Sequence, residues 1–242
     1  YTVGAGLVQI YTASENRLAL QELLPEAIIS CYDSYDDSQL SHLLDWADVV
    51  CIGCGLGMGQ ISEKILKNVL KNVSCPCVID ADGLNLLNGK IELLNQCRAP
   101  VILTPHMKEM SRLTGWSIDK IMEDRFHALD QIIKQSGPDT KSSIICVLKD
   151  SRTVVAQTNR QKFVNLAGNN SMAKGGSGDV LAGTIAGLLA QHMAPFEAAA
   201  VGVFLHACGG DEAKKSKGSY SVLARDLIQG MADAMKNAKE CR

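Results

Sequence analysis

The sequence lacks any long apolar segment. None of its apolar runs reaches the roughly 18 residues that a membrane-spanning helix needs. The opening residues, YTVGAGLVQIYT, also lack the basic start and the continuous apolar core of a signal peptide. We therefore expect a cytoplasmic protein that has no membrane partner.

An excess of charge of either sign is also missing. Lysine and arginine number 24, aspartate and glutamate number 26, and the formal net charge is −2. Such a chain has no general electrostatic attraction for nucleic acid or for an anionic membrane surface. A small anionic substrate could still be held by local backbone dipoles. The composition thus favours a small-molecule substrate and no nucleic-acid partner.

The chain contains no internal repeat and no low-complexity segment. Its 242 residues are enough for one large domain or two small ones. The most linker-like stretch, residues 134–143, is short. We expect a single domain that spans residues 1–242.

The nine cysteines are an odd number, which fits poorly with a complete set of internal disulfides. In a cytoplasmic protein most of them would be reduced thiols. Cys51, Cys54, Cys75 and Cys77 follow the order C-x2-C and then C-x-C, and the second pair is one residue too short for a zinc ribbon. Cys51 also lies in a run typical of a buried strand, where cysteine is a small hydrophobe. We therefore predict no metal site.

Short apolar runs alternate with amphipathic patterns up to about residue 150. Continuous apolar strands separated by amphipathic helices predict a parallel sheet covered by helices on both faces. After residue 150 two short β-runs, 153–157 and 162–166, predict a hairpin, and long helices follow. The expected strands are 5–11, 48–53, 77–80, 100–104 and 144–149, and the expected helices lie near 14–23, 37–46, 59–72, 118–136, 178–192, 195–213 and 222–239.

Polar or glycine-rich stretches follow the expected strands or precede an expected helix. In a doubly wound α/β sheet, ligands bind beyond the carboxyl ends of the strands. Because these stretches share that position, we expect them to form one site. They are GCGLGMG (53–59), DADGLN (80–85), TPHMKEM (104–110), LKDSRT (148–153) and NSMAKGGSGDVLAG (170–183).

The last stretch places three glycines and a carboxylate at the expected start of a helix. Gly175, Gly176 and Gly178 allow backbone N–H groups to turn inward, and the helix adds the positive end of its dipole. Together they suit a phosphate group. Asp179 would repel phosphate, but it could take a proton from a hydroxyl beside that phosphate. The alternative is a structural N-cap aspartate that follows a glycine turn.

The other stretches each have two interpretations. The alternating glycines of 53–59 are not the dinucleotide fingerprint, and they indicate either close approach of a ligand or a tight turn. Asp82 is expected to cap the helix that follows it. Asp80 could bind a cation, and this assignment stays open. His106 could contact substrate or could be a loop histidine without a role.

The motifs GAGLV, GCGLG, DADGLNLL, TPHMKEMSRL and NSMAKGGSGDVLAGTIAGLLAQ occur in this order from residue 4 onward. Together they resemble the ADP- or ATP-dependent NAD(P)H-hydrate dehydratases, and the resemblance extends to about residue 230. It implies a ribokinase-like fold, which is a three-layer α/β/α arrangement with a mostly parallel central sheet. It also implies a homo-oligomer, which is a tetramer in this family.

The resemblance implies a repair reaction on hydrated NADH or NADPH. ADP or ATP, with Mg²⁺, would phosphorylate the ring hydroxyl, because hydroxide itself is a poor leaving group. The lone pair of the ring nitrogen would then help to expel phosphate and restore the reduced cofactor.

The resemblance also implies roles for individual residues. Asp179 would deprotonate the hydroxyl and contact the hydrated nicotinamide. His106 and a glycine of the first turn, Gly57, would also contact the hydrated cofactor. The implied nucleotide-binding residues are Lys149, Asp150, Ser151, Arg152, Thr153, Asn169, Gly175, Gly176 and Gly178, of which Gly178 would contact phosphate.

The chain departs from the family pattern in several places. Cys54 stands where the family usually has proline, Gly83 where it has alanine, and Lys108 and Asp150 where it has glycine. Family members also have a strand, a glycine-containing loop and a helix before GAGLV, whereas only YTV precedes it here. We therefore expect that the first strand–loop–helix unit is missing.

Two other functions share these features. A ribokinase-like kinase for a vitamin or a sugar would use the same glycine turn and the same base, and it would release a phosphorylated product. A non-catalytic nucleotide-binding protein would keep the glycine turn alone.

Overall fold

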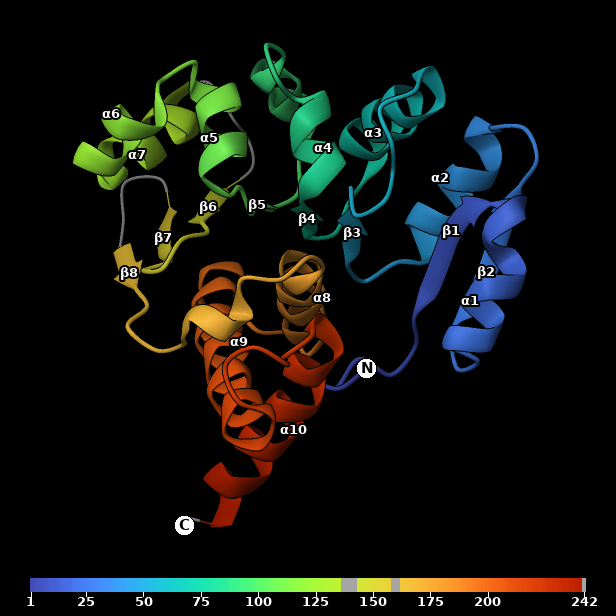
Figure 1. Ribbon diagram of the computed structural model, residues 1–242. Coiled ribbons are helices and arrows are strands. Elements are labelled where there is room, and N and C mark those ends of the chain that lie inside the picture. Colours follow the sequence, from blue (N-terminus) through green and yellow to red (C-terminus); the bar gives the residue numbers. More distant parts are fainter. Residues whose placement is uncertain (136–142, 158–161, 241–242) are drawn as a thin grey trace.

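The computed structural model describes residues 1–135, 143–157 and 162–240. Its centre is a six-stranded sheet between two layers of helices (Figure 1). The strand order follows the chain. The first four strands pair with one another in parallel, and the fifth strand pairs antiparallel with both the fourth and the sixth. The predicted α/β class with a mostly parallel central sheet is thus confirmed. The strands are β3 (Val50–Ile52), β4 (Cys77–Ile79), β5 (Val101–Leu103), β6 (Ile144–Leu148), β7 (Val154–Gln157) and β8 (Lys162–Val164).

Each central strand is apolar along its whole length because both of its faces are covered. In β4, Cys77 and Ile79 pack into the core on one side, and Val78 packs into the core on the other. The first core is closed by α3 (Gln60–Asn72), α4 (Ala81–Leu86), the 3-10 segment Ile91–Gln96, α5 (Met107–Thr114), α6 (Ile118–Glu123) and α7 (Arg125–Gln135). The second is closed by α8 (Ser177–Ala190) and α9 (Pro195–Lys217), and α10 (Ala224–Glu240) packs against α9.

The first two strands form a separate parallel pair, seen in blue in Figure 1. β1 (Gln9–Ala13) and β2 (Ile28–Tyr32) are joined by the 3-10 turn Ser14–Asn16 and α1 (Arg17–Leu23). The run at 28–32 was not expected as a strand, and the predicted strand at 5–11 begins four residues late. α2 (Asp37–Trp46) leads from this pair toward β3 and packs against α3.

The helix expected at 118–136 is two helices, so that prediction is wrong in detail. Asp124 leaves the helical conformation, and its carboxylate accepts a hydrogen bond from the backbone N–H of His127 at 2.9 Å. It therefore ends α6 and caps the start of α7. The expected linker, 134–143, and the hairpin turn between β7 and β8 lie largely outside the described residues.

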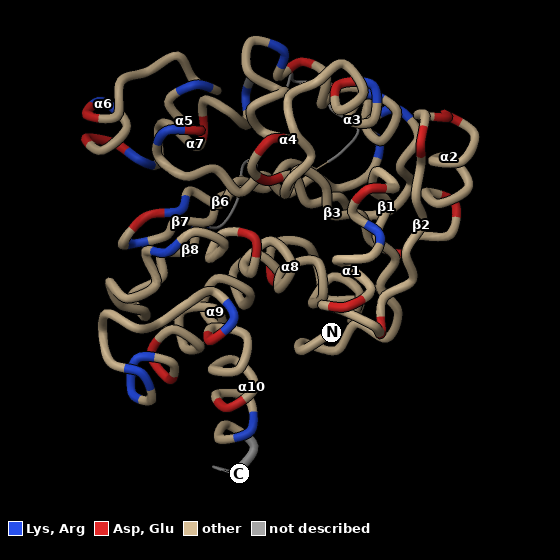
Figure 2. Tube along the Cα trace, turned by 45° about the vertical axis from the view of Figure 1, so that its right-hand side comes forward, with Lys and Arg blue, Asp and Glu red and all other residues tan. Residues whose placement is uncertain are grey.

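Basic and acidic residues are interspersed along the chain (Figure 2), as expected for a net charge of −2. Within the described ranges, none of the helices combines the length and the apolar character required to cross a bilayer.

Candidate active site

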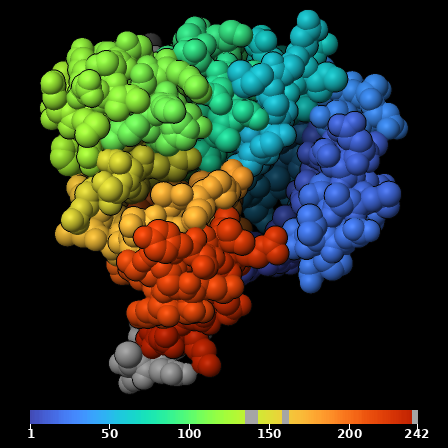
Figure 3. All heavy atoms as spheres, in the orientation of Figure 1, coloured from blue at the N-terminus to red at the C-terminus, as the bar shows by residue number. Residues whose placement is uncertain are grey.

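The carboxyl ends of four parallel strands and the start of α8 meet at one edge of the sheet. Asp80 follows β4 directly, Lys149 follows β6 directly, and His106 lies three residues beyond the end of β5. Figure 3 shows a hollow between the light-orange segment and the blue N-terminal segment. The polar stretches therefore cluster at the strand ends, as the sequence predicted.

A buried ion pair lies beneath the start of α8. Lys149 Nζ is 2.6 Å from Asp80 Oδ1, and the Asp80 side chain is only 1% exposed. A methyl group added at Gly178 would lie 3.1 Å from Lys149 Nζ and 3.6 Å from Asp80 Oδ2. Lys149 thus partly neutralises Asp80 and also places a positive charge against the first turn of α8.

The first turn of α8 is open to an anion. Gly176 occupies the N-cap position at φ +85°, where a residue with a side chain would be strained, and no side chain caps the helix. The N–H of Ser177 donates to the carbonyl oxygen of Lys174 at 3.2 Å, so the N–H groups left for a ligand are those of Gly178 and Asp179. The helix dipole is positive at this end. With Lys149 beside them, these groups form a site suited to phosphate.

Asp179 projects from the same turn and is exposed. Its carboxylate lies within 4.8 Å of a carboxylate oxygen of Asp80 and of Cys54 Sγ. No residue in the described part of the chain donates a hydrogen bond to it. Because Gly176 holds the N-cap position, the alternative of a structural capping aspartate is wrong. The carboxylate is free to act as a base.

The glycine turn after β3 is shaped by contact with the chain itself. Gly53 has φ +121°, and a Cβ there would lie 1.9 Å from the carbonyl oxygen of Asp80. The Gly57 N–H donates a hydrogen bond of 2.9 Å to Asp82 Oδ2. Asp82 therefore fixes the turn. The prediction that Asp82 caps α4 is wrong, because the N-cap residue of α4 is Asp80.

His106 has a structural role that neither sequence interpretation included. Its Nδ1 accepts hydrogen bonds from the backbone N–H groups of Lys108 and Glu109, at 3.1 and 3.2 Å. Glu109 in turn accepts the N–H of His106 at 2.8 Å, which completes a capping box for α5. The His106 side chain is half exposed, and contact with substrate stays a prediction.

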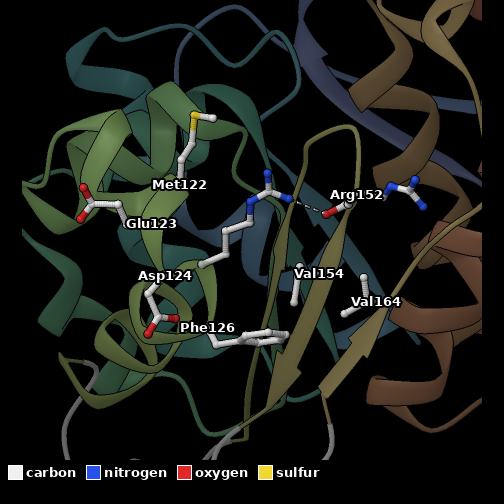
Figure 4. Close-up of a pocket in the computed structure, with 8 residues that line it drawn as sticks. Met122, Glu123, Asp124, Phe126, Arg152, Val154 and Val164 are labelled. Atoms are coloured by element: carbon white, nitrogen blue, oxygen red, sulfur yellow. Dashed lines mark hydrogen bonds between the residues drawn. The ribbon is translucent and has the colours of Figure 1, made fainter.

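Residues 149–153 form the turn between β6 and β7, which is held from the side of α7. Arg125 Nη2 lies 2.8 Å from Asp150 Oδ2. Arg125 Nη1 donates to the carbonyl oxygen of Arg152 at 3.5 Å, the bond that is dashed in Figure 4. Thr153 Oγ1 donates to the carbonyl of Asp150 at 3.1 Å. The Asp150 carboxylate is therefore engaged by Arg125, and nucleotide binding by this turn, which includes Ser151, stays a prediction.

Asn169 lies before the glycine turn and is also engaged. Its side chain accepts the Ser171 N–H at 3.0 Å, which caps the 3-10 turn Asn170–Met172, and donates to Asp211 Oδ1 at 2.7 Å. It fixes the segment that leads to Gly175 and Gly176. A direct contact with nucleotide stays a prediction.

His206 is a residue of this region that the sequence reasoning missed. It lies on α9, is 8% exposed, and has Nε2 3.4 Å from Ser177 Oγ at the start of α8. Burial lowers the pKa of His206 to about 4, and the nearby charge of Lys149 acts in the same direction. A histidine within the apolar run VGVFLHACGG was the available signal.

The low pKa of His206 predicts a specific loss of stability in acid. The unfolded histidine titrates near 6.5, so the unfolded chain takes up the proton first as the pH falls. The free energy of unfolding should therefore decrease between about pH 6.5 and pH 4, by about 3 kcal/mol from this group. Denaturant unfolding of the parent and of His206→Gln across this range should give a flatter curve for the variant. An equal change on replacing the exposed His42 by glutamine, or no change with His206→Gln, would contradict the assignment.

The four-cysteine zinc site, which the sequence argued against, can now be judged from the sheet. Cys51 is aligned with Val78 of the neighbouring strand, and so faces the α8–α9 side. Cys77 packs in the core on the opposite face. The Cys51–Cys54 and Cys75–Cys77 pairs therefore do not converge on one zinc ion.

Comparison with known proteins agrees with this arrangement. The sequence profile of a family described as NAD(P)H-hydrate dehydratase matches residues 1–232. The chain belongs to this NAD(P)H-hydrate dehydratase family. Over 225 residues it is 38% identical to the bifunctional NAD(P)H-hydrate repair enzyme Nnr of Escherichia coli, a match that covers 93% of this chain and 41% of that enzyme. The chain thus spans less than half the length of this relative.

Solved structures of similar proteins confirm the ribokinase-like fold. A ribokinase-like superfamily protein of Enterococcus faecalis is 32% identical, with a TM-score of 0.79 over 98% of this chain and 78% of that one. The ADP/ATP-dependent NAD(P)H-hydrate dehydratase of Bacillus subtilis, co-crystallised with ATP/Mg²⁺, is 26% identical, with a TM-score of 0.78 over 98% of this chain and 80% of that one.

Proposed function

We propose that this protein uses ADP or ATP to dehydrate hydrated NADH or NADPH and so restores the reduced cofactor. The observation that carries the proposal is the placement of Asp179. An unpartnered carboxylate stands in the first turn of α8, whose free N–H groups and neighbouring Lys149 suit phosphate. Membership of the dehydratase family supports the choice of substrate.

The reaction follows from these groups. Asp179 takes the proton of the ring hydroxyl, and the oxygen attacks the terminal phosphoryl group of the nucleotide. The bond from that phosphorus to the leaving oxygen of the nucleotide breaks. The ring nitrogen lone pair then expels the new ester as inorganic phosphate, and loss of a proton from the adjacent ring carbon restores the dihydronicotinamide.

The surrounding residues would orient the reactants. The start of α8 and Lys149 would hold the phosphates, with the 149–153 turn, Asn169 and the glycines Gly175, Gly176 and Gly178 lining the nucleotide. His106 and Gly57 would face the nicotinamide. Mg²⁺ would neutralise phosphate charge, and Asp80 Oδ2 is an oxygen ligand of the type that this ion prefers. A single cytoplasmic domain that forms a homo-oligomer belongs to the same proposal.

The assay is direct, because restoring the dihydronicotinamide ring restores its near-ultraviolet absorbance. With nucleotide and Mg²⁺, reduced cofactor and inorganic phosphate should appear in equal amounts from hydrated NADH or NADPH. No stable phosphorylated cofactor should accumulate. Phosphorylation of a vitamin or a sugar, without any activity on hydrated cofactor, would replace the dehydratase proposal by the kinase alternative.

A further inference from the structure

One thiol and two carboxylates converge beside the phosphate site. Cys54 Sγ, a carboxylate oxygen of Asp80 and one of Asp179 all lie within 4.8 Å of one another. Cys51, three residues earlier, carries a second exposed thiol. The proposed reaction uses the Asp179 carboxylate but gives neither thiol a role.

The two thiols are reachable from solvent. Cys51 lies on β3, the edge strand of the central sheet, and Cys54 lies in the turn that follows, and both residues are exposed. A short C-x2-C segment at the end of a strand is a spacing found in zinc-binding pairs. Cys54 therefore can contribute a sulfur ligand without any rearrangement of the buried core.

Asp80 provides an independent sign of a missing ligand. Its Oδ1 is paired with Lys149, whereas no residue in the described ranges donates a hydrogen bond to Oδ2. This oxygen points to the start of α8, 3.6 Å from where a Gly178 Cβ would lie, and the side chain is 99% buried. A buried acceptor without a partner is costly, so a cation or a donor is expected to meet it.

We propose that Cys54, Asp80 and Asp179 bind a thiophilic divalent cation of the Zn²⁺ class, with solvent in the fourth position, and that this ion inhibits the enzyme. Zn²⁺ is bound in proteins by cysteine sulfur and carboxylate oxygen, usually by four ligands in a tetrahedral arrangement. On binding, the ion replaces the thiol proton of Cys54, which passes to solvent. This mixed site differs from the four-cysteine arrangement that the sequence argued against, and it revises the expectation of no metal site.

Inhibition follows from the ligand set and rests on the proposed function. The lone pair with which Asp179 would take the hydroxyl proton is donated to the metal, so the base is lost while the ion is bound. The site is also rich in negative charge, since carboxylate oxygens of Asp179 and Asp80 lie within 4.8 Å of Cys54 Sγ. Mg²⁺ would share only the Asp80 oxygen with this ion, because it prefers oxygen ligands to the thiol of Cys54.

Binding can be measured without any turnover. Co²⁺ is added to the purified, reduced and chelator-free protein, and the near-ultraviolet thiolate-to-cobalt band is followed during displacement by Zn²⁺. We expect one metal per chain, with a cobalt band in the parent. Cys54→Ser should remove the band and weaken Zn²⁺ binding at least tenfold, whereas Cys51→Ser should keep the band, because Cys51 is not one of the three converging groups. The matched control is Cys208→Ser, a thiol on α9 that should leave both properties unchanged.

Circular dichroism and a thermal melt establish that each variant is folded, and Cys54→Ala replaces the serine variant if that one is not. Unchanged Zn²⁺ affinity in both Cys54 variants, or the absence of a cobalt–thiolate band in the parent, would overturn the metal site. Inhibition is then compared as the ratio of activity with and without Zn²⁺ in each protein. Because binding is read optically, a protein without dehydratase activity would still report whether the site exists.

Discussion

Replacing Asp179 by asparagine is expected to lower turnover of hydrated NADH by about 10²–10⁴-fold, the usual cost of losing a general base. Asparagine keeps the size of the side chain and removes its ability to take a proton. The carboxylate has no hydrogen-bond donor in the described part of the chain, so its loss should not disturb the fold. Nucleotide affinity should stay within a few-fold of the parent, because the free N–H groups of α8 and Lys149 remain.

The measurement pairs a turnover assay with calorimetric titration of ADP and ATP on the same preparation. Asp233→Asn serves as the matched control, since this aspartate lies exposed on α10. Near-normal turnover of the Asp179 variant would remove it from the proposed mechanism. A parallel loss of nucleotide binding would instead indicate that the carboxylate supports the phosphate site.

The second large effect is expected from Gly178→Val. The added Cβ would lie 3.1 Å from Lys149 Nζ, and its two methyl groups would extend into the space where phosphate would approach the helix. The Lys149 ammonium would have to shift by a few tenths of an ångström to accommodate it. We expect stabilisation by ADP or ATP, measured as a shift in Tm, to be lost in the variant.

Gly183→Val is the matched control for this variant. It introduces the same side chain on the same helix, at an exposed position where an added Cβ meets no atom within 4 Å. The control should keep the shift in Tm with nucleotide. A Gly178 variant that nucleotide stabilises as strongly as the parent would show that the phosphate site lies elsewhere.

Local sequence was enough to predict the sheet and the start of α8. Apolar runs such as residues 144–148 are buried on both faces, so a central strand can be predicted from its own residues without knowledge of the strands that it pairs with. The glycines at 175–178 and the carboxylate at 179 are neighbours in the chain, so their joint position at a helix start follows from local chemistry alone. β2 was missed because its burial is only partial and it pairs with β1 outside the central sheet.

Interactions between distant residues could not be predicted in this way. Asp80 and Lys149 are 69 residues apart, and only the order of the strands brings their side chains together. Asp82 was assigned to its own helix, whereas its partner is Gly57, 25 residues earlier. His206 reaches Ser177 because α9 packs on α8, which a single helical pattern does not reveal.

Gly53 and Cys54 are adjacent in the chain but should differ in their freedom to change during evolution. Any side chain at Gly53 would collide with the Asp80 carbonyl and displace the buried carboxylate, so we expect no other residue to be accepted at this position. The exposed side chain of Cys54 meets no such barrier. If the thiol is what confers sensitivity to zinc, a lineage could gain or lose that trait by a single codon change, with the glycine turn beside it intact.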